Sequence, residues 1–263
     1  MALGKIDFYS QSLNRMVSFH VLLPGDRISP EENQHYHRNM KTLYLFHGYS
    51  NSSWEWLLSS QIMRFSDKYN LAVVLPSSEN SFYLNGKGTG RAYCTYVGEE
   101  LIEYTRKVFG FSNKREDTFV GGLSMGGFGA LHTGLEYNET FSKIMALSSA
   151  LIIYNVAGKK EDFVDAAAEY YYYSSVFGDL DKVVESRNNP ERIILDIKES
   201  GGQIPDIYMA CGTEDFLLTE NRTFHQFLQK HQIPVKYYES PGAHDFDFWN
   251  QYLETAVQWM VQD

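Results

Sequence analysis

Five glycines crowd around one serine in the stretch TFVGGLSMGGFGAL, residues 118–131. Glycine inside a helix or strand costs about 0.5–1 kcal/mol relative to alanine, so the crowding indicates that backbone segments approach each other closely there. Within this stretch, Gly122 to Gly126 match the pattern G-x-S-x-G. The residues before the pattern predict a short strand, and those after it predict a helix. A strand, sharp turn and helix in that order are the setting of a nucleophile elbow.

The pattern alone also fits a plain glycine-rich turn, but the flanking strand and helix favour the elbow. In an elbow, side chains at Gly122 and Gly126 would collide with neighbouring backbone. Ser124 is therefore the candidate nucleophile. Because a serine hydroxyl is a weak nucleophile by itself, the hypothesis requires a histidine base and an acid that orients the base.

Predicted strands and helices alternate from about Thr42 to the end of the chain. Short apolar runs such as TLYLFHG and DIYMACG are typical of buried strands, and apolar residues at helical spacing lie between such runs. The alternation predicts an α/β fold, a mostly parallel central sheet with helices on both faces. Ahead of it, residues 5–24 predict a hairpin that turns near Leu13 and Asn14.

Two further predictions concern helices. Ser52 and Glu55 have the spacing of a capping box, and apolar residues then recur at helical spacing over 54–69, which predicts one helix. The segment 150–203 contains no clear buried strand. We expect one domain over residues 1–263, with 150–203 as a small helical insertion near the carboxyl edge of the sheet. As a lid or cap, this insertion, including Tyr170 to Tyr173, would shape the substrate pocket.

His244 is the candidate base among the eight histidines. It lies in SPGAHDFDFW, after the last predicted strand and before the last predicted helix. A fold with a nucleophile elbow places its base there, last in the chain order serine, acid, histidine. His47 stands beside Gly48 at a strand end, which suits a supporting role near the site. His132 is expected to be a core residue.

The acid should follow a late strand and precede His244. The stretch MACGTEDFLL supplies Glu214 and Asp215 in the turn after such a strand. We favour Asp215, although sequence position barely separates the two and both could be solvated helix caps. Asp245 and Asp247 are weaker candidates because they flank the base in sequence.

Two backbone N–H groups are expected to form an oxyanion hole. One belongs to Met125, the residue after the nucleophile, and the other to the loop after the TLYLFHG strand, where Tyr49 is the natural position. Two such donors could stabilise the transition state by roughly 3 kcal/mol each. A simple strand-ending turn at HGYS is compatible with this interpretation.

The composition of the chain limits the kinds of partner that it is expected to bind. The formal net charge is −10 with no block of lysine and arginine, which argues against nucleic acid. The sequence contains no apolar run of about 18 residues, which a membrane-spanning helix would need, and no signal peptide is visible. We therefore expect a cytoplasmic protein. Cys94 and Cys211 are expected to be buried free thiols. The sequence is compatible with a homo-oligomer.

The motifs LFHGYSNSSWEW, GLSMGGFGAL, CGTEDFLL and PGAHDFDFW resemble the esterase D-like branch of the α/β-hydrolases. Within it the chain is most similar to bacterial tributyrin esterases, which are related to feruloyl and acetyl esterases and to S-formylglutathione hydrolases. The resemblance covers nearly the whole chain. It implies a carboxylesterase acting on short acyl esters of small molecules, with no metal or organic cofactor, and it carries the triad onto Ser124, Asp215 and His244.

Other functions remain open. A thioesterase or an acyltransferase would use the same residues with a different leaving group or acceptor. A non-catalytic binding module could be built on the same fold, but a serine, an acid and a histidine in the expected order argue against it.

Overall fold

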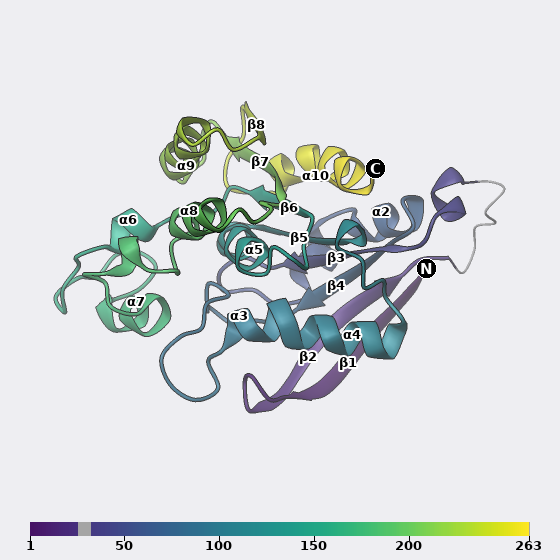
Figure 1. The fold of residues 1–263 in the computed structure, drawn as a ribbon, viewed down its shortest axis with the longest axis horizontal. Helices are drawn as coiled ribbons and strands as arrows, with labels where there is room; N and C mark the ends of the chain where they lie inside the picture. The colour runs from purple at the N-terminus through teal and green to yellow at the C-terminus, as the bar shows by residue number, and fades with distance from the viewer. Residues whose placement is uncertain (26–32, 263) are drawn as a thin grey trace.

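An eight-stranded sheet forms the centre of the computed structural model, which describes residues 1–25 and 33–262 (Figure 1). The strands are β1 (Ala2–Ser10), β2 (Arg15–Leu23), β3 (Lys41–Phe46), β4 (Leu71–Pro76), β5 (Thr118–Leu123), β6 (Lys143–Leu147), β7 (Asp206–Gly212) and β8 (Val235–Ser240). Their order in the sheet is β1-β2-β4-β3-β5-β6-β7-β8. β2 pairs antiparallel with β1 and β4, and all other neighbours are parallel. The predicted hairpin and mostly parallel sheet are confirmed.

Helices cover both faces of this sheet. They are α1 (Glu55–Ser59), α2 (Ile62–Lys68), α3 (Tyr93–Thr95), α4 (Leu101–Phe109), α5 (Met125–Glu136), α6 (Ile153–Val156), α7 (Tyr170–Phe177), α8 (Pro190–Ser200), α9 (Leu218–Lys230) and α10 (Phe246–Val261). The chain also forms the 3₁₀ turns η2 (Gln34–His37), η4 (Arg115–Asp117) and η5 (Val183–Glu185) and the π-helical turn η3 (Tyr96–Glu100). Helices α1, α2 and α10 pack on one face, while α3, α4, α5, α8 and α9 pack on the other.

Alternation along the strands supplies both cores, because successive side chains of a strand point to opposite faces. In β3, Leu43 and Leu45 face the helices α2 and α10, whereas Tyr44 and Phe46 face the core that contains α4 and α5. All four side chains are buried. The sheet is therefore rigidly held on both sides, and the loops at the carboxyl ends of its parallel strands stand on a fixed base.

The prediction of a single helix over 54–69 is wrong, because the chain forms two helices there, α1 and α2. Ser60 interrupts them in an extended conformation; its hydroxyl donates to the Trp56 carbonyl and accepts the Ile62 N–H. Such local side-chain bonds compete with the helical ladder. The expected capping box is also absent, since the Glu55 carboxylate binds Gly48 and Asn51 instead.

The segment 150–203 contains α6, α7, η5 and α8. Its last helix, α8, packs on α5 as part of the layer that covers the sheet. Helices α6 and α7 lie together at one end of the molecule, at the left in Figure 1, away from the N-terminal hairpin. Residues from 150 to 173 contribute to a pocket at the carboxyl ends of the strands.

Candidate active site

Ser124 stands between β5 and α5 in a strained turn. Its backbone has φ 53° and ψ −121°, a conformation that costs a non-glycine residue of order 1–3 kcal/mol and is found at functional sites. Glycines make the turn possible. A Cβ on Gly122 would collide with the carbonyl of Gly126, and one on Gly126 would lie 2.5 Å from the Phe46 carbonyl oxygen. The packing reason given for these two glycines from the sequence is thus confirmed.

Three residues predicted from the sequence meet at this turn. His244 Nε2 lies 2.9 Å from Ser124 Oγ, and His244 Nδ1 lies 2.9 Å from Asp215 Oδ2. Since an ionised carboxylate can only accept hydrogen bonds, Nδ1–H donates to Asp215, which leaves Nε2 to accept the Ser124 hydroxyl proton. The residues come from the turns after β5, β7 and β8, so the parallel sheet aligns them at one edge.

Asp215 is buried in a polar setting that favours its charged form. Burial alone would raise the pKa of this carboxyl, but hydrogen bonds from His244, the Leu217 N–H and Ser148 outweigh it and lower the pKa below its usual range. Ser148 in turn accepts a bond from Trp249 Nε1 at 2.9 Å. Sequence reasoning missed Ser148 and Trp249, whose contacts join β6 to α10 across the fold.

The alternative acids lie elsewhere. Glu214 is exposed; its carboxylate accepts bonds from the Gly242 N–H and the Thr213 hydroxyl. Asp245 caps the start of α10 by accepting the Phe248 N–H, and Asp247 lies in the first turn of that helix. The structure thus brings Asp215, and none of these three, within hydrogen-bond distance of the His244 imidazole.

Met125 and Tyr49 both border the space in front of Ser124. Met125 is the first residue of α5, where backbone N–H groups have no partner within the helix and the helix dipole favours negative charge. Tyr49 follows β3 in the loop His47-Gly48-Tyr49. His47 supports that loop: its Nε2 accepts the Ser78 N–H, so its Nδ1–H donates to the Gly48 carbonyl. Burial lowers the pKa of His47 to about 4, which keeps the imidazole neutral.

Glu55 is a further polar group at this site, and sequence reasoning missed it. Its side chain is 9% exposed and borders the same pocket as Ser124 and His244. Burial raises the pKa of Glu55, against hydrogen bonds from Gly48 and Asn51 and the nearby His244, which act in the opposite direction. The available signal in the sequence was that Glu55 directly precedes Trp56, a residue of the core. The spacing of Glu55 from Ser52 instead suggested a local role as part of a helix cap.

A pocket of about 570 Å³ opens in front of Ser124, within the range of small-molecule sites. Its wall is largely apolar and includes Phe82, Ile152 and Val156. Phe216, which is 73% exposed, packs its ring 4.5 Å from the His244 ring at the same site. The pocket can therefore hold an apolar group next to the serine hydroxyl.

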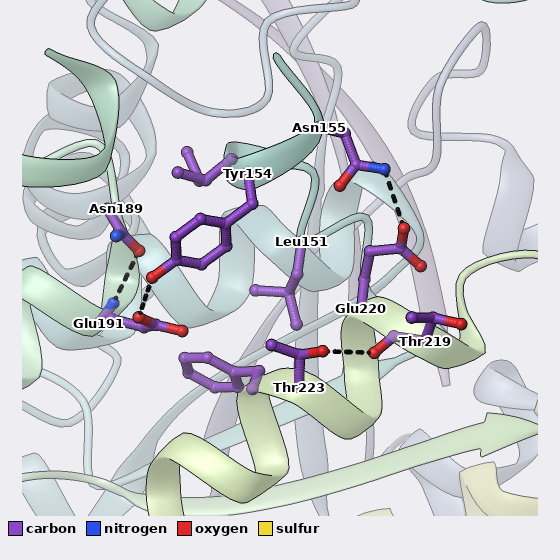
Figure 2. Close-up of a pocket in the computed structure, with 10 residues that line it drawn as sticks. Leu151, Tyr154, Asn155, Asn189, Glu191, Thr219, Glu220 and Thr223 are labelled. Carbon is purple, nitrogen blue, oxygen red and sulfur yellow. Dashed lines mark hydrogen bonds between the residues drawn. The ribbon is translucent and has the colours of Figure 1, made fainter. Parts of the chain in front are cut away.

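A second hollow of about 240 Å³ adjoins the first, and Asn155 and Glu220 line both. Figure 2 shows it between the segment around Leu151 and Tyr154 and the helix α9. The Tyr154 hydroxyl donates to Glu191, and Asn155 Nδ2 donates to Glu220 Oε1 at 2.9 Å (Figure 2). The hollow is therefore lined both by these polar side chains and by apolar ones, including Leu151, Ile153 and Phe224.

The predictions for the two cysteines and for His132 as buried side chains are confirmed. Cys94 and Cys211 are both buried free thiols, as predicted. His132 is buried between Cys94 and the Arg187 carbonyl.

Within residues 1–25 and 33–262, no three or more His, Cys, Asp or Glu side chains are grouped to hold a metal ion. None of the helices in this part of the chain is long and apolar enough to cross a membrane.

The strand order and a serine at the β5–α5 turn define an α/β-hydrolase. The family described as "Putative esterase" matches residues 10–260, and the chain belongs to this esterase family. It is 46% identical to an acetyl esterase of Caldicellulosiruptor saccharolyticus over 99% of this chain and 98% of that protein.

Solved structures agree with this placement. Fluorophosphonate-binding serine hydrolase F of Staphylococcus aureus has a TM-score of 0.85 at 27% identity, covering 100% of this chain and 99% of that one. An S-formylglutathione hydrolase of Staphylococcus aureus has a TM-score of 0.83 at 27% identity, covering 99% of each chain. The chain is accordingly a carboxylic ester hydrolase.

Proposed function

We propose that this protein is a serine carboxylesterase that hydrolyses short-chain acyl esters of small molecules through Ser124, His244 and Asp215. The observation that carries the proposal is the continuous line of hydrogen bonds from Asp215 through His244 to Ser124, which ends at a strained turn facing a pocket. Each group has the partner that its role requires.

The proposed reaction begins when the Ser124 oxygen attacks the ester carbonyl carbon while His244 Nε2 takes the hydroxyl proton. The carbonyl oxygen becomes an oxyanion, which the N–H groups of Tyr49 and Met125 stabilise. His244 then gives its proton to the departing alcohol, and an acyl-enzyme remains. Water, activated by the same imidazole, hydrolyses the acyl-enzyme and releases the acid. Asp215 stabilises the imidazolium in both steps.

Pocket size and similarity support a short acyl group. A space of about 570 Å³ must hold both the acyl group and the first part of the alcohol, and the similar protein from Caldicellulosiruptor is an acetyl esterase. The adjoining hollow gives room for a larger alcohol. A thioesterase is the second candidate, favoured by the similarity to an S-formylglutathione hydrolase.

The test compares the wild type with Ser124→Ala. We expect the variant to fold and to lose hydrolysis by a factor on the order of 10⁶ in turnover, as in other serine hydrolases that lose the nucleophile. A fluorophosphonate probe should label the wild type and not the variant. p-Nitrophenyl esters of increasing chain length, with acetylated sugars, feruloyl esters and thioesters alongside, identify the preferred substrate. Near wild-type turnover in folded Ser124→Ala would refute the proposal.

A further inference from the structure

The Glu55 carboxylate reaches back from the start of α1 to the loop after β3. Its Oε2 accepts the Gly48 N–H at 2.6 Å, and its Oε1 accepts Asn51 Nδ2–H at 2.8 Å. Bonds this short are typical of an ionised acceptor. Both oxygens accept from N–H donors, so the site is built for a carboxylate and fits an amide poorly.

The loop at Gly48 is held on every side. The peptide between His47 and Gly48 has its carbonyl bound by the Tyr83 hydroxyl at 3.0 Å and its N–H bound by Glu55. Since a trans peptide is planar and its C=O and N–H point in opposite directions, these two partners fix the plane from both ends. Tyr83 itself is stacked on Phe46 and has a strained backbone, with φ 56°.

The next peptide carries the candidate oxyanion donor. Its carbonyl, that of Gly48, accepts His47 Nδ1–H at 2.7 Å, and its N–H is that of Tyr49. By the same planarity, a fixed Gly48 carbonyl sets the direction of the Tyr49 N–H. The following N–H, that of Ser50, is occupied by Asn80 Oδ1 at 2.7 Å. The Tyr49 N–H is thus the donor that this arrangement leaves for a ligand at the pocket.

We propose that Glu55 is a positioning residue of the esterase reaction: it clamps the His47–Gly48 peptide and thereby aims the Tyr49 N–H at the oxyanion. The inference rests on the proposed function, because it requires an oxyanion formed at Ser124. Catalysis by fixed donors depends on their orientation before the reaction begins. A loosened loop should therefore slow the chemical step more than it weakens substrate binding.

The test uses the pair Glu55 and Asn51. Glu55→Gln replaces one acceptor oxygen with an NH₂ group, which must oppose either the Gly48 N–H or the Asn51 amide. We expect kcat to fall by roughly tenfold to a hundredfold, less than the 10²–10³ lost with a whole donor, while KM changes little. In the double variant Asn51→Asp with Glu55→Gln, the amide oxygen introduced at position 55 can accept from Gly48, while its NH₂ group donates to the carboxylate introduced at position 51. This exchange should restore most of the kcat that Glu55→Gln loses. Asn51→Asp alone places two carboxylates together and should itself lower kcat.

Glu100→Gln is the matched control. Glu100 accepts the backbone N–H of Gln11 at 2.6 Å in the turn between β1 and β2 and does not line the pocket around Ser124. Its variant should lower the melting temperature without changing kcat. A wild-type kcat in folded Glu55→Gln, or no recovery in the double variant, would overturn the inference. If Ser124→Ala also keeps its activity, the proposed function fails; if only the Glu55 variants do, the inference alone fails.

Discussion

At the residue scale, Glu214 and Asp215 are neighbours with different partners. Asp215 accepts His244 Nδ1–H, while Glu214 accepts the Gly242 N–H and stays exposed. We predict that Asp215→Asn stays folded, because its side-chain oxygen can still accept the Leu217 N–H, yet loses roughly 10⁴ in turnover. The loss follows because an amide favours the wrong histidine tautomer, as in serine proteases.

The comparison variant is Glu214→Gln, whose turnover should change by less than about tenfold because the residue lies outside the proton path. Steady-state kinetics on one p-nitrophenyl ester, with circular dichroism as the check on folding, decide between the two. Should Glu214→Gln prove the more damaging change, the acid would have to be assigned to Glu214.

Local sequence order was enough to place Ser124, His244 and the pair Glu214 and Asp215 near one another, because each follows the end of a parallel strand and those ends share one edge of the sheet. Sequence order did not separate Asp215 from Glu214, and the family resemblance was needed to favour Asp215. The same reasoning could not find Glu55 or Ser148. Glu55 has a spacing that fits a helix cap, and its actual partner, Gly48, lies seven residues away on a turn whose path depends on Tyr83 and His47. Ser148 contacts Asp215 and is held by Trp249, which lies about a hundred residues further along the chain.

At the element scale, α7 contributes Tyr173 to the lining of the pocket. The Tyr173 hydroxyl donates to Asp165, which also accepts the Ala167 and Ala168 N–H groups. Residues 165–167 line the pocket. Tyr171 instead is 59% exposed, and its hydroxyl donates to Glu161. One helix therefore offers both a test position and its control.

We predict that Tyr173→Phe changes the ratio of kcat/KM between acetyl and longer acyl esters by roughly fivefold. That factor corresponds to the loss of one hydrogen bond worth about 1 kcal/mol, here a bond that holds the loop at Asp165. Tyr171→Phe should leave the ratio as in the wild type. An unchanged substrate ranking in Tyr173→Phe would mean that the segment has a structural role only.

Element periodicity predicted the strands and α5 well, because a buried strand or helix has a regular apolar pattern. It failed over 54–69, where Leu58 continues the apolar spacing but is 78% exposed on α1. The Ser60 hydroxyl ends α1 there through bonds to the Trp56 carbonyl and the Ile62 N–H. Periodicity carries no information on such a break, since it depends on a polar side chain turning to the backbone.

At the scale of the whole molecule, the alternation of strands and helices was enough to predict a mostly parallel sheet. It could not give the order β1-β2-β4-β3-β5-β6-β7-β8, because neighbours in a sheet are chosen by long-range packing. That packing also buries His132 against Cys94 and the Arg187 carbonyl. Burial lowers the pKa of His132 to about 4, which makes the stability of the whole fold depend on pH.

In the unfolded chain a histidine has a pKa of about 6.5. Between about pH 6.5 and pH 4 the unfolded state therefore binds a proton at this residue that the folded state excludes, and the free energy of unfolding falls as the pH falls. From pH 7.5 to pH 4.5, the contribution of His132 to this loss is about 2–3 kcal/mol.

His132→Gln has no such titration, and its amide can still donate to the Arg187 carbonyl. We predict that its free energy of unfolding, measured with urea at the two pH values, decreases by about 2–3 kcal/mol less than that of the wild type. His37→Gln, at an exposed position in η2, should decrease as the wild type does. Equal decreases in wild type and His132→Gln would show that the acid sensitivity arises at other groups.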